Sequence, residues 1–298
     1  MTEYIILYKM EIDSKCYTFK RLEVTDGLFD PSVDATYVIT LEGNGRYESI
    51  ETQLKTYHPT KEVYIMTNRG YKRCKKNLKI DLPRYDLTDA FINVFRHANE
   101  AGYKNVLVLE DDFTFNDKIF DTTILSTVNA FVSARTDTPF IYLLGCLPQL
   151  QIPYDWNHNM PVQSGGTHAV IYSRSYRDIA IRDYKETTID DWDTYCKQTW
   201  NRYTYKEPLI YQLFPMTENR KNWAVPDYML YLADVVLRFH KLDINVEPGY
   251  SIFYLWSKIN FYLTIALCIA LLWFLIFYLP FTKTAARAVK YVKRATGF

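Results

Sequence analysis

An uninterrupted apolar segment near the C-terminus most strongly constrains how this 298-residue chain folds. Residues 259–279 read INFYLTIALCIALLWFLIFYL and include no charged side chain. As an α-helix this segment would be about 31 Å long, which matches the roughly 30 Å hydrocarbon thickness of a bilayer. Its aromatic residues lie at or near the ends, as membrane interfaces favour, namely Trp256, Tyr262, Trp273 and Tyr278. The pattern predicts a C-terminal transmembrane helix.

Two features of the sequence disagree about the side of the membrane on which the N-terminal part lies. The basic tail, residues 280–298, carries five cationic and no acidic side chains, which favours a cytosolic C-terminus or a basic helix on the membrane surface. Residues 1–10 read as a strand rather than an export signal, which favours a tail-anchored protein. We expect a single-pass membrane protein with its large domain in the cytosol.

Charge and cysteine content exclude two classes of protein. The net charge is +1, and setting aside the five cations of the tail leaves the rest at −4, so a nucleic-acid partner is not expected. The cysteines are odd in number, widely spaced and without a CxxC pair: Cys16, Cys74, Cys146, Cys196 and Cys268. This spacing fits neither a disulfide framework nor a zinc cluster, so we predict free thiols in a reducing compartment.

The remainder of the chain alternates strand and helix patterns. We expect an N-terminal strand pair within residues 1–30, formed by Glu3–Met10 and Cys16–Val24, and then one large domain over 31–250. Strands are predicted at 36–41, 62–67, 105–109 and 139–144, with a turn at 42–45 and a helix at 46–57. This order predicts an α/β fold with a mostly parallel sheet flanked by helices.

The clearest soluble helix is predicted at Leu87–Asn99. Its apolar residues recur on a single face, with Asp86 as the expected N-cap and Gly102 as the expected end. The strand that follows, Asn105–Leu109, is almost entirely apolar, which is typical of a central strand buried on both faces.

Three consecutive acids, Glu110, Asp111 and Asp112, follow that buried strand. Open α/β sheets bind ligands beyond the carboxyl ends of their strands. Clustered carboxylates repel each other unless a cation neutralises them, and hard oxygen donors suit Mg²⁺ or Mn²⁺. We therefore predict a divalent metal site that can bridge a diphosphate, although a solvated acidic turn would have the same sequence.

The segment Asn105–Phe115 (NVLVLEDDFTF), with the helix before it, resembles the signature of glycosyltransferase family 25, the lipopolysaccharide- and collagen-modifying enzymes. Further segments resemble elements of that family in the same order. They are Tyr37–Leu41 with Arg46, Leu143–Gly145, Gly166–Ala169 with Ser173 and Arg174, Asp193–Tyr195, and Pro208–Gln212. The likeness spans about 36–223, most of the domain.

Two positions depart from the family pattern. Leu87-Thr88-Asp89 stands where the family has Leu-Ser-His, and Thr217 stands where it has a late serine. The chain therefore resembles a divergent branch. A viral enzyme that glycosylates the virus's own proteins would suit a cytosolic domain.

The resemblance implies a GT-A-type fold that binds a nucleotide sugar, a UDP-sugar above all, together with Mn²⁺ or Mg²⁺. Asp112, with Glu110 or Asp111, would hold the metal. Thr40, Leu41 and Arg46, together with Glu110 and Asp111, would lie at the nucleotide.

Transfer to a hydroxyl of a glycan, protein or lipid acceptor with inversion would need a carboxylate base. Asp193 is the first candidate for this base, and Asp190 and Asp191 are the alternatives. His168 would be a further ligand or a structural strand histidine. Trp192, Trp156 and Trp223 would offer faces to a sugar ring or belong to the core.

Two other functions fit less well. A catalytically inactive glycosyltransferase-like module would bind glycan or nucleotide without turnover, and the missing Ser-His pair favours this alternative. A nucleotidyltransferase would usually have a Gly-rich phosphate loop with a lysine, which Gly43-Asn44-Gly45-Arg46 does not match.

Overall fold

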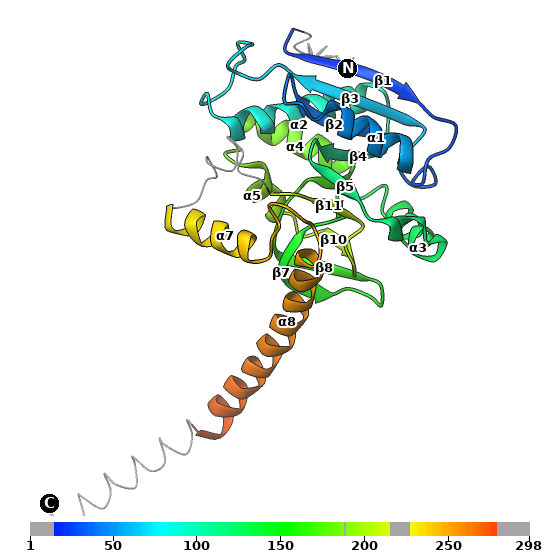
Figure 1. Ribbon diagram of the computed structural model, residues 1–298. Coiled ribbons are helices and arrows are strands. Elements are labelled where there is room, and N and C mark those ends of the chain that lie inside the picture. Colours follow the sequence, from blue (N-terminus) through cyan, green and yellow to red (C-terminus); the bar gives the residue numbers. More distant parts are fainter. Residues whose placement is uncertain (1–14, 188, 215–226, 279–298) are drawn as a thin grey trace, which may run out of the picture.

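The computed structural model describes residues 15–278 except 188 and 215–226 (Figure 1). An α/β domain carries one long helix, which extends away from it toward the C-terminus (Figure 1). Four sequence predictions fall outside the described residues: the strand Glu3–Met10, Thr217, Trp223 and the basic tail.

Nine strands form the main sheet in the part of the chain that the structure describes. Their spatial order is β1 (Tyr17–Glu23), β3 (Glu62–Asn68), β2 (Ala35–Leu41), β4 (Asn105–Glu110), β9 (Ala169–Ser173), β6 (Ile141–Leu143), β10 (Arg202–Tyr205), β8 (His158–Gly165) and β7 (Leu147–Pro153). Parallel pairing joins β3 to β2, β2 to β4, and β6 to β10, and the other neighbours are antiparallel. The sheet is therefore mixed, with parallel strands around β2 and β4.

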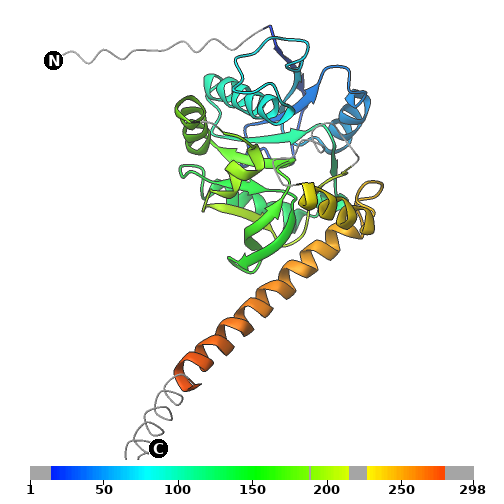
Figure 2. The same cartoon turned by 90° about the vertical axis from the view of Figure 1, so that its left-hand side faces the viewer.

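Helices cover both faces of this sheet. On one face lie α2 (Pro83–Glu100), α4 (Arg174–Glu186) and α5 (Trp192–Lys197). On the other lie α1 (Tyr47–Tyr57), the 3-10 helix η1 (Asp117–Phe120), α3 (Thr122–Ser133) and the two-stranded sheet of β5 (Phe113–Phe115) and β11 (Ile210–Gln212). Figure 2 shows α2 and α4 on the opposite side of the sheet from α1.

Strand β4 lies in the middle of this arrangement and is buried on both faces, as predicted. Val106 and Val108 pack into the layer of α2, whereas Leu107 and Leu109 pack into the layer of α1 and α3. Side chains alternate across a strand, so an apolar residue at every position is what burial on both faces requires.

Helix α2 begins one turn earlier than predicted. Pro83 occupies its first position, where a missing backbone N–H has no consequence. The predicted apolar face is confirmed, since Ala90, Phe91, Val94 and Ala98 are fully buried. Asp86 is not the N-cap; it lies inside the first turn and pairs with Lys76 instead.

Strand β1 forms the edge of the main sheet, antiparallel to β3. Immediately before it, Cys16 forms a disulfide with Cys74, with a Cα–Cα distance of 5.6 Å. The prediction that these two cysteines are free was wrong, because residues 58 positions apart in sequence become neighbours only through the β1–β3 pairing. Cys146, Cys196 and Cys268 are free thiols.

Helix α8 (Gly249–Trp273), with its π-helical extension to Tyr278, contains residues 259–278 of the predicted apolar segment. Residues Gly249–Phe277 are long and apolar enough to cross a membrane, the only such helix among the described residues. The helix begins about ten residues before the apolar run. Its first turns belong to the domain, where Tyr250, Tyr254 and Ser257 are buried and Ser257 Oγ donates to Gln151 Oε1 at 3.1 Å.

The Cys16–Cys74 bond makes a prediction about thiol counts. When the denatured chain is treated with a thiol-alkylating reagent, its intact mass should show three alkylated cysteines without prior reduction and five after reduction. Reduction of the folded chain should lower the free energy of unfolding by about 2–4 kcal/mol, because the bond restricts the unfolded chain. Cys74→Ser should have the same effect and Cys268→Ser, on the exposed face of α8, should not. Five alkylations without reductant would contradict the bond.

Candidate active site

The three predicted acids lie at the carboxyl end of β4, where Glu110 ends the strand and Asp111 and Asp112 follow it. The side chains of Asp111 and Asp112 are 16% and 15% exposed. One guanidinium serves both: Arg46 Nη1 pairs with Asp111 Oδ1 and lies 3.1 Å from Asp112 Oδ2. Arg46 stands at the N-terminus of α1, so the loop after β2 places its positive charge over the end of β4.

The turn after β2 supplies further partners for Asp111. Gly43 and Gly45 have φ of +75° and +77°, values that side chains disfavour, and they let the chain turn sharply around Asn44. Asn44 Nδ2 donates to Asp111 Oδ2, and Thr40 Oγ1 lies 3.3 Å from the same oxygen. Thr40 and Arg46 therefore lie beside the acids. Asn44 was not predicted, although its place between two turn glycines is a usable signal.

Asp112 is held from the opposite side by β11. This strand pairs with β5, which starts directly after Asp112, and Gln212 Nε2 donates to Asp112 Oδ1 at 2.9 Å. The backbone N–H of Gln212 donates to Tyr250 Oη, also at 2.9 Å. Two hydrogen bonds therefore connect the acid cluster to the first turn of α8.

Asp193 joins the cluster through Thr167. The Thr167 hydroxyl lies 2.5 Å from Asp193 Oδ1 and 3.4 Å from Glu110 Oε1. The backbone N–H of Gly166 also donates to Asp193, with 3.3 Å to Oδ2. The loop between β8 and β9 thus brings the predicted base next to the predicted metal ligands. Thr167 is a further site residue, one that the sequence motif contained without indicating its role.

The two alternative bases point elsewhere. Asp190 accepts from Tyr85 Oη at 2.7 Å and lies 3.7 Å from Lys79 Nζ, and its side chain is 63% exposed. Asp191 is the N-cap of α5 and accepts from the backbone N–H of Thr194 at 2.8 Å. Neither makes a recorded contact with the acids, so Asp193 is the one of the three that the fold brings to them.

Burial raises the pKa of all three strand-end acids. The pKa of Glu110 lies well above its usual value, first because of burial and then because of the charges of Asp112, Asp193 and Asp111. Burial also raises the pKa of Asp111 and of Asp112, while Arg46 acts in the opposite direction on both. The cluster thus contains more negative charge than Arg46 alone compensates.

The donor chemistry of this cluster fits a divalent cation, because its side chains present hard carboxylate oxygens. No group of three or more His, Cys, Asp or Glu side chains within the described ranges forms a ready-made metal cage. Arg46 already pairs with both Asp111 and Asp112, whereas the Glu110 side chain has, among the described residues, only the long contact from Thr167. Glu110 is therefore the least engaged of the three carboxylates.

Two aromatic residues singled out in the sequence lie in the core. Trp192 is 2% exposed and stacks on Phe91 with ring centroids 4.7 Å apart, so it does not offer a face to a sugar. His168 is fully buried, its Nε2 lies 3.1 Å from the carbonyl oxygen of Ile210, and burial lowers its pKa to about 4. It is a neutral structural histidine. Trp156 is 95% exposed in the turn between β7 and β8.

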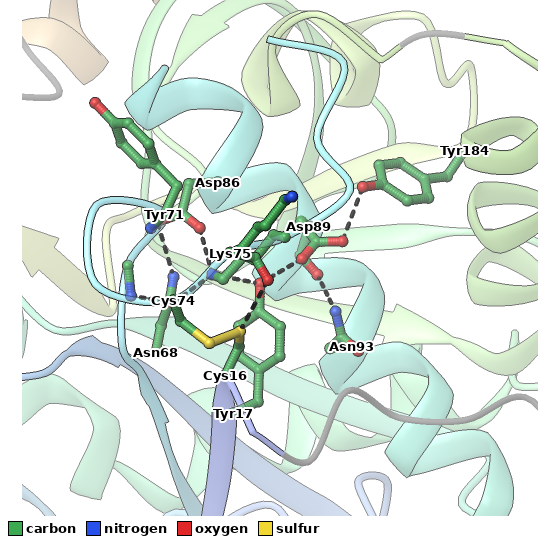
Figure 3. A network of polar contacts seen from close by, with 12 residues as sticks. Cys16, Tyr17, Asn68, Tyr71, Cys74, Lys75, Asp86, Asp89, Asn93 and Tyr184 are labelled. Atoms are coloured by element: carbon green, nitrogen blue, oxygen red, sulfur yellow. Dashed lines mark hydrogen bonds and ion pairs between the residues drawn. A yellow bond between two sulfur atoms is a disulfide. The ribbon is translucent and has the colours of Figure 1, made fainter. Parts of the chain in front are cut away.

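Asp89, which replaces the histidine of the resembled family, is part of a polar network behind the site (Figure 3). It accepts from Tyr17 Oη at 2.5 Å and from Tyr184 Oη at 2.8 Å. Tyr17 belongs to β1 and Tyr184 to α4. Asp89 therefore joins the sheet edge to two helices, a structural role that explains an acid at this position.

Asp86, one turn earlier on α2, forms a buried ion pair with Lys76. Lys76 Nζ also donates to Tyr17 Oη at 2.8 Å and to Asn68 Oδ1 at 2.6 Å. Asp86 Oδ2 accepts from Asn68 Nδ2 at 3.2 Å. Near the carboxyl end of β3, this pair fixes the loop from 69 to 82. In the same loop, Arg73 Nη1 donates to the carbonyl of Glu42, at the turn that carries Asn44.

Removal of one partner of this pair should be strongly destabilising. The side chains of Lys76 and Asp86 are 2% and 8% exposed, so Asp86→Ala would leave a buried ammonium without its counter-charge. We expect a loss of about 3–5 kcal/mol in the free energy of unfolding, measured by urea denaturation of the whole chain in detergent. Asp81→Ala, at an exposed acid just before α2, is the matched control. Equal effects of the two would show that the pair is not buried in solution.

Comparison with known proteins gives one distant structural likeness to report. No protein-family model matches the chain, and no curated protein matches it. Among solved structures, it is similar to the "Crystal Structure of A197 from STIV", with a TM-score of 0.38 and 12% sequence identity. That match covers 62% of this chain and 87% of A197. A likeness at this score carries no argument about function.

Proposed function

We propose that the protein is a membrane-anchored, metal-dependent glycosyltransferase of GT-A type that transfers a sugar from a nucleotide sugar, a UDP-sugar by preference, to an acceptor hydroxyl. One observation carries this proposal. The fold brings Arg46, the three strand-end acids and Asp193 together from three separate segments of the chain, at the edge of the sheet where α/β folds bind ligands. Each of these segments belongs to the ordered set of motifs that resembles glycosyltransferase family 25.

The site offers a distinct role to each group. Arg46 provides positive charge near a donor diphosphate. Bound at Glu110, Asp111 and Asp112, Mn²⁺ or Mg²⁺ would stabilise the negative charge of the leaving nucleotide. Asp193 takes the proton of the acceptor hydroxyl as the bond from that oxygen to the anomeric carbon forms. The bond from this carbon to the diphosphate breaks, and its electron pair leaves with the nucleotide.

For the membrane topology we propose the domain on the oxidising side, with α8 crossing the bilayer and the basic tail in the cytosol. The Cys16–Cys74 bond supports this side, because reducing compartments keep thiols free. The five cations after the apolar segment support it through the positive-inside rule. This proposal replaces the cytosolic domain expected from the N-terminal sequence.

Release of nucleotide from a panel of sugar nucleotides tests the activity. The whole chain in detergent should release nucleotide from one donor with Mn²⁺ and lose this activity with EDTA. Asp112→Asn, which removes one charge and keeps the shape, should reduce turnover at least about 100-fold, as loss of charge stabilisation in a buried site does. Asp137→Asn, at an exposed acid in the loop after α3, should leave turnover unchanged.

An inactive module that binds nucleotide is the competing function, and the position of Arg46 favours it. A guanidinium that already pairs with Asp111 and Asp112 reduces the need for a metal there. Nucleotide binding that is measurable by calorimetry, with no release from any donor and no response to EDTA, would establish the module and contradict the enzyme.

Substitution of Asp193 and of Asp190 distinguishes these two candidate bases. Asp193→Asn should reduce turnover about 10²–10⁴-fold with little change in donor binding, because a general base contributes this much to the chemical step. Asp190→Asn should leave turnover within a few-fold, because Asp190 contacts Tyr85 and Lys79 outside the cluster. Equal losses in the two variants would exclude Asp193 as the base.

A further inference from the structure

Helix α7 (Asp227–Phe239) has one apolar face that nothing in the described chain covers. Its buried residue Leu237 packs with Leu242, Tyr250 and Tyr254 in a cluster at the base of α8. At about 100° per residue, five other side chains lie on the opposite side of the helix. They are Tyr228, Tyr231, Leu232, Val235 and Phe239, between 44% and 80% exposed. These five residues form the outer face of α7.

The flanks of the outer face carry the charged groups. Asp234 and Arg238 form an ion pair at 2.8 Å, one helical turn apart. Arg238 is 63% exposed, and Lys241 beyond the end of the helix is exposed too. A helix that buries Leu237 and exposes an apolar face with two tyrosines shares these features with helices that lie in a membrane interface, where tyrosine is enriched.

The position of α7 relative to α8 fits that environment. Both views show α7 crosswise to α8 and beside its first turns (Figures 1 and 2). The close packing of Leu242 against Gly249, where an added Cβ would lie 2.6 Å from a Leu242 methyl, fixes the connection between the two helices. About ten residues of α8, or roughly 15 Å, separate its start from the apolar segment. The headgroup layer extends about 5–7 Å beyond the hydrocarbon core on each side, so a helix at this level lies close above that layer when α8 spans the core.

We propose that the outer face of α7 docks on the phospholipid surface of the same bilayer that α8 crosses. The domain then contacts the membrane through α7 as well as through α8. The continuity of α7 with the base of α8 selects lipid as the occupant. This inference rests on the membrane span proposed above for α8.

Site-directed spin labelling of the whole chain in vesicles tests this docking. Three variants in a Cys268→Ser background, whose remaining free thiols Cys146 and Cys196 are buried, each carry one introduced cysteine for the label. They are Leu232→Cys on α7, Leu267→Cys on α8, and Thr52→Cys on the exposed side of α1. The vesicles are phosphatidylcholine with one quarter phosphatidylglycerol. For each label, the rate of collision with oxygen, which partitions into lipid, is compared with the rate of collision with a water-soluble nickel complex.

We expect oxygen to dominate at Leu232 and Leu267 and nickel to dominate at Thr52. A second substitution, Val235→Glu, should shift the Leu232 label several-fold toward nickel and leave the Leu267 label unchanged. Nickel access at Leu232 with oxygen access at Leu267 would overturn the docking and keep the span. Nickel access at Leu267 would overturn the span itself. Low collision rates of the Leu232 label with both reagents, together with broadening of its spectrum by a nearby second label, would show a protein partner or a second copy instead of lipid.

Discussion

The repulsion between acidic side chains at the end of β4 is the constraint on which the rest of the site depends. Buried carboxylates this close together are unstable unless positive charge and hydrogen-bond donors reach them. Arg46, Asn44, Thr40, Gln212 and Thr167 provide these contacts. They come from the end of β2 and the loop after it, from β11, and from the loop before β9. The neutralisation of one strand end therefore determines where three distant segments of the chain lie.

Local sequence predicted the parts of this arrangement that depend on neighbouring residues. The apolar run Asn105–Leu109 is the central buried strand, the periodic apolar residues of α2 form its buried face, and Gly43 and Gly45 mark a real turn. Each of these signals lies within one segment, where the spacing of apolar residues and the turn-forming glycines determine the local structure. The acidic motif was therefore placed correctly at a strand end from the sequence alone.

What the sequence left open or predicted wrongly depends on contacts between distant segments. Nothing near Cys16 indicates Cys74, and nothing near Trp192 shows that α5 packs its ring on Phe91. The same holds for Asp86, which the local sequence predicts as a helix N-cap and which instead pairs with Lys76 from the preceding loop. Among the three acids near α5, only the tertiary position of Thr167 separates Asp193 from Asp190 and Asp191.

The continuity of α8 from the domain core into its apolar segment has a consequence for encounter with the acceptor. The buried contacts of Tyr250 and Tyr254 clamp the start of this helix, so the span that we propose is rigidly joined to the domain without a flexible linker. Such a site samples only a thin slab above one leaflet. For the glycosyltransferase that we propose, the rate of encounter would then depend on the surface density and lateral diffusion of acceptors within that slab.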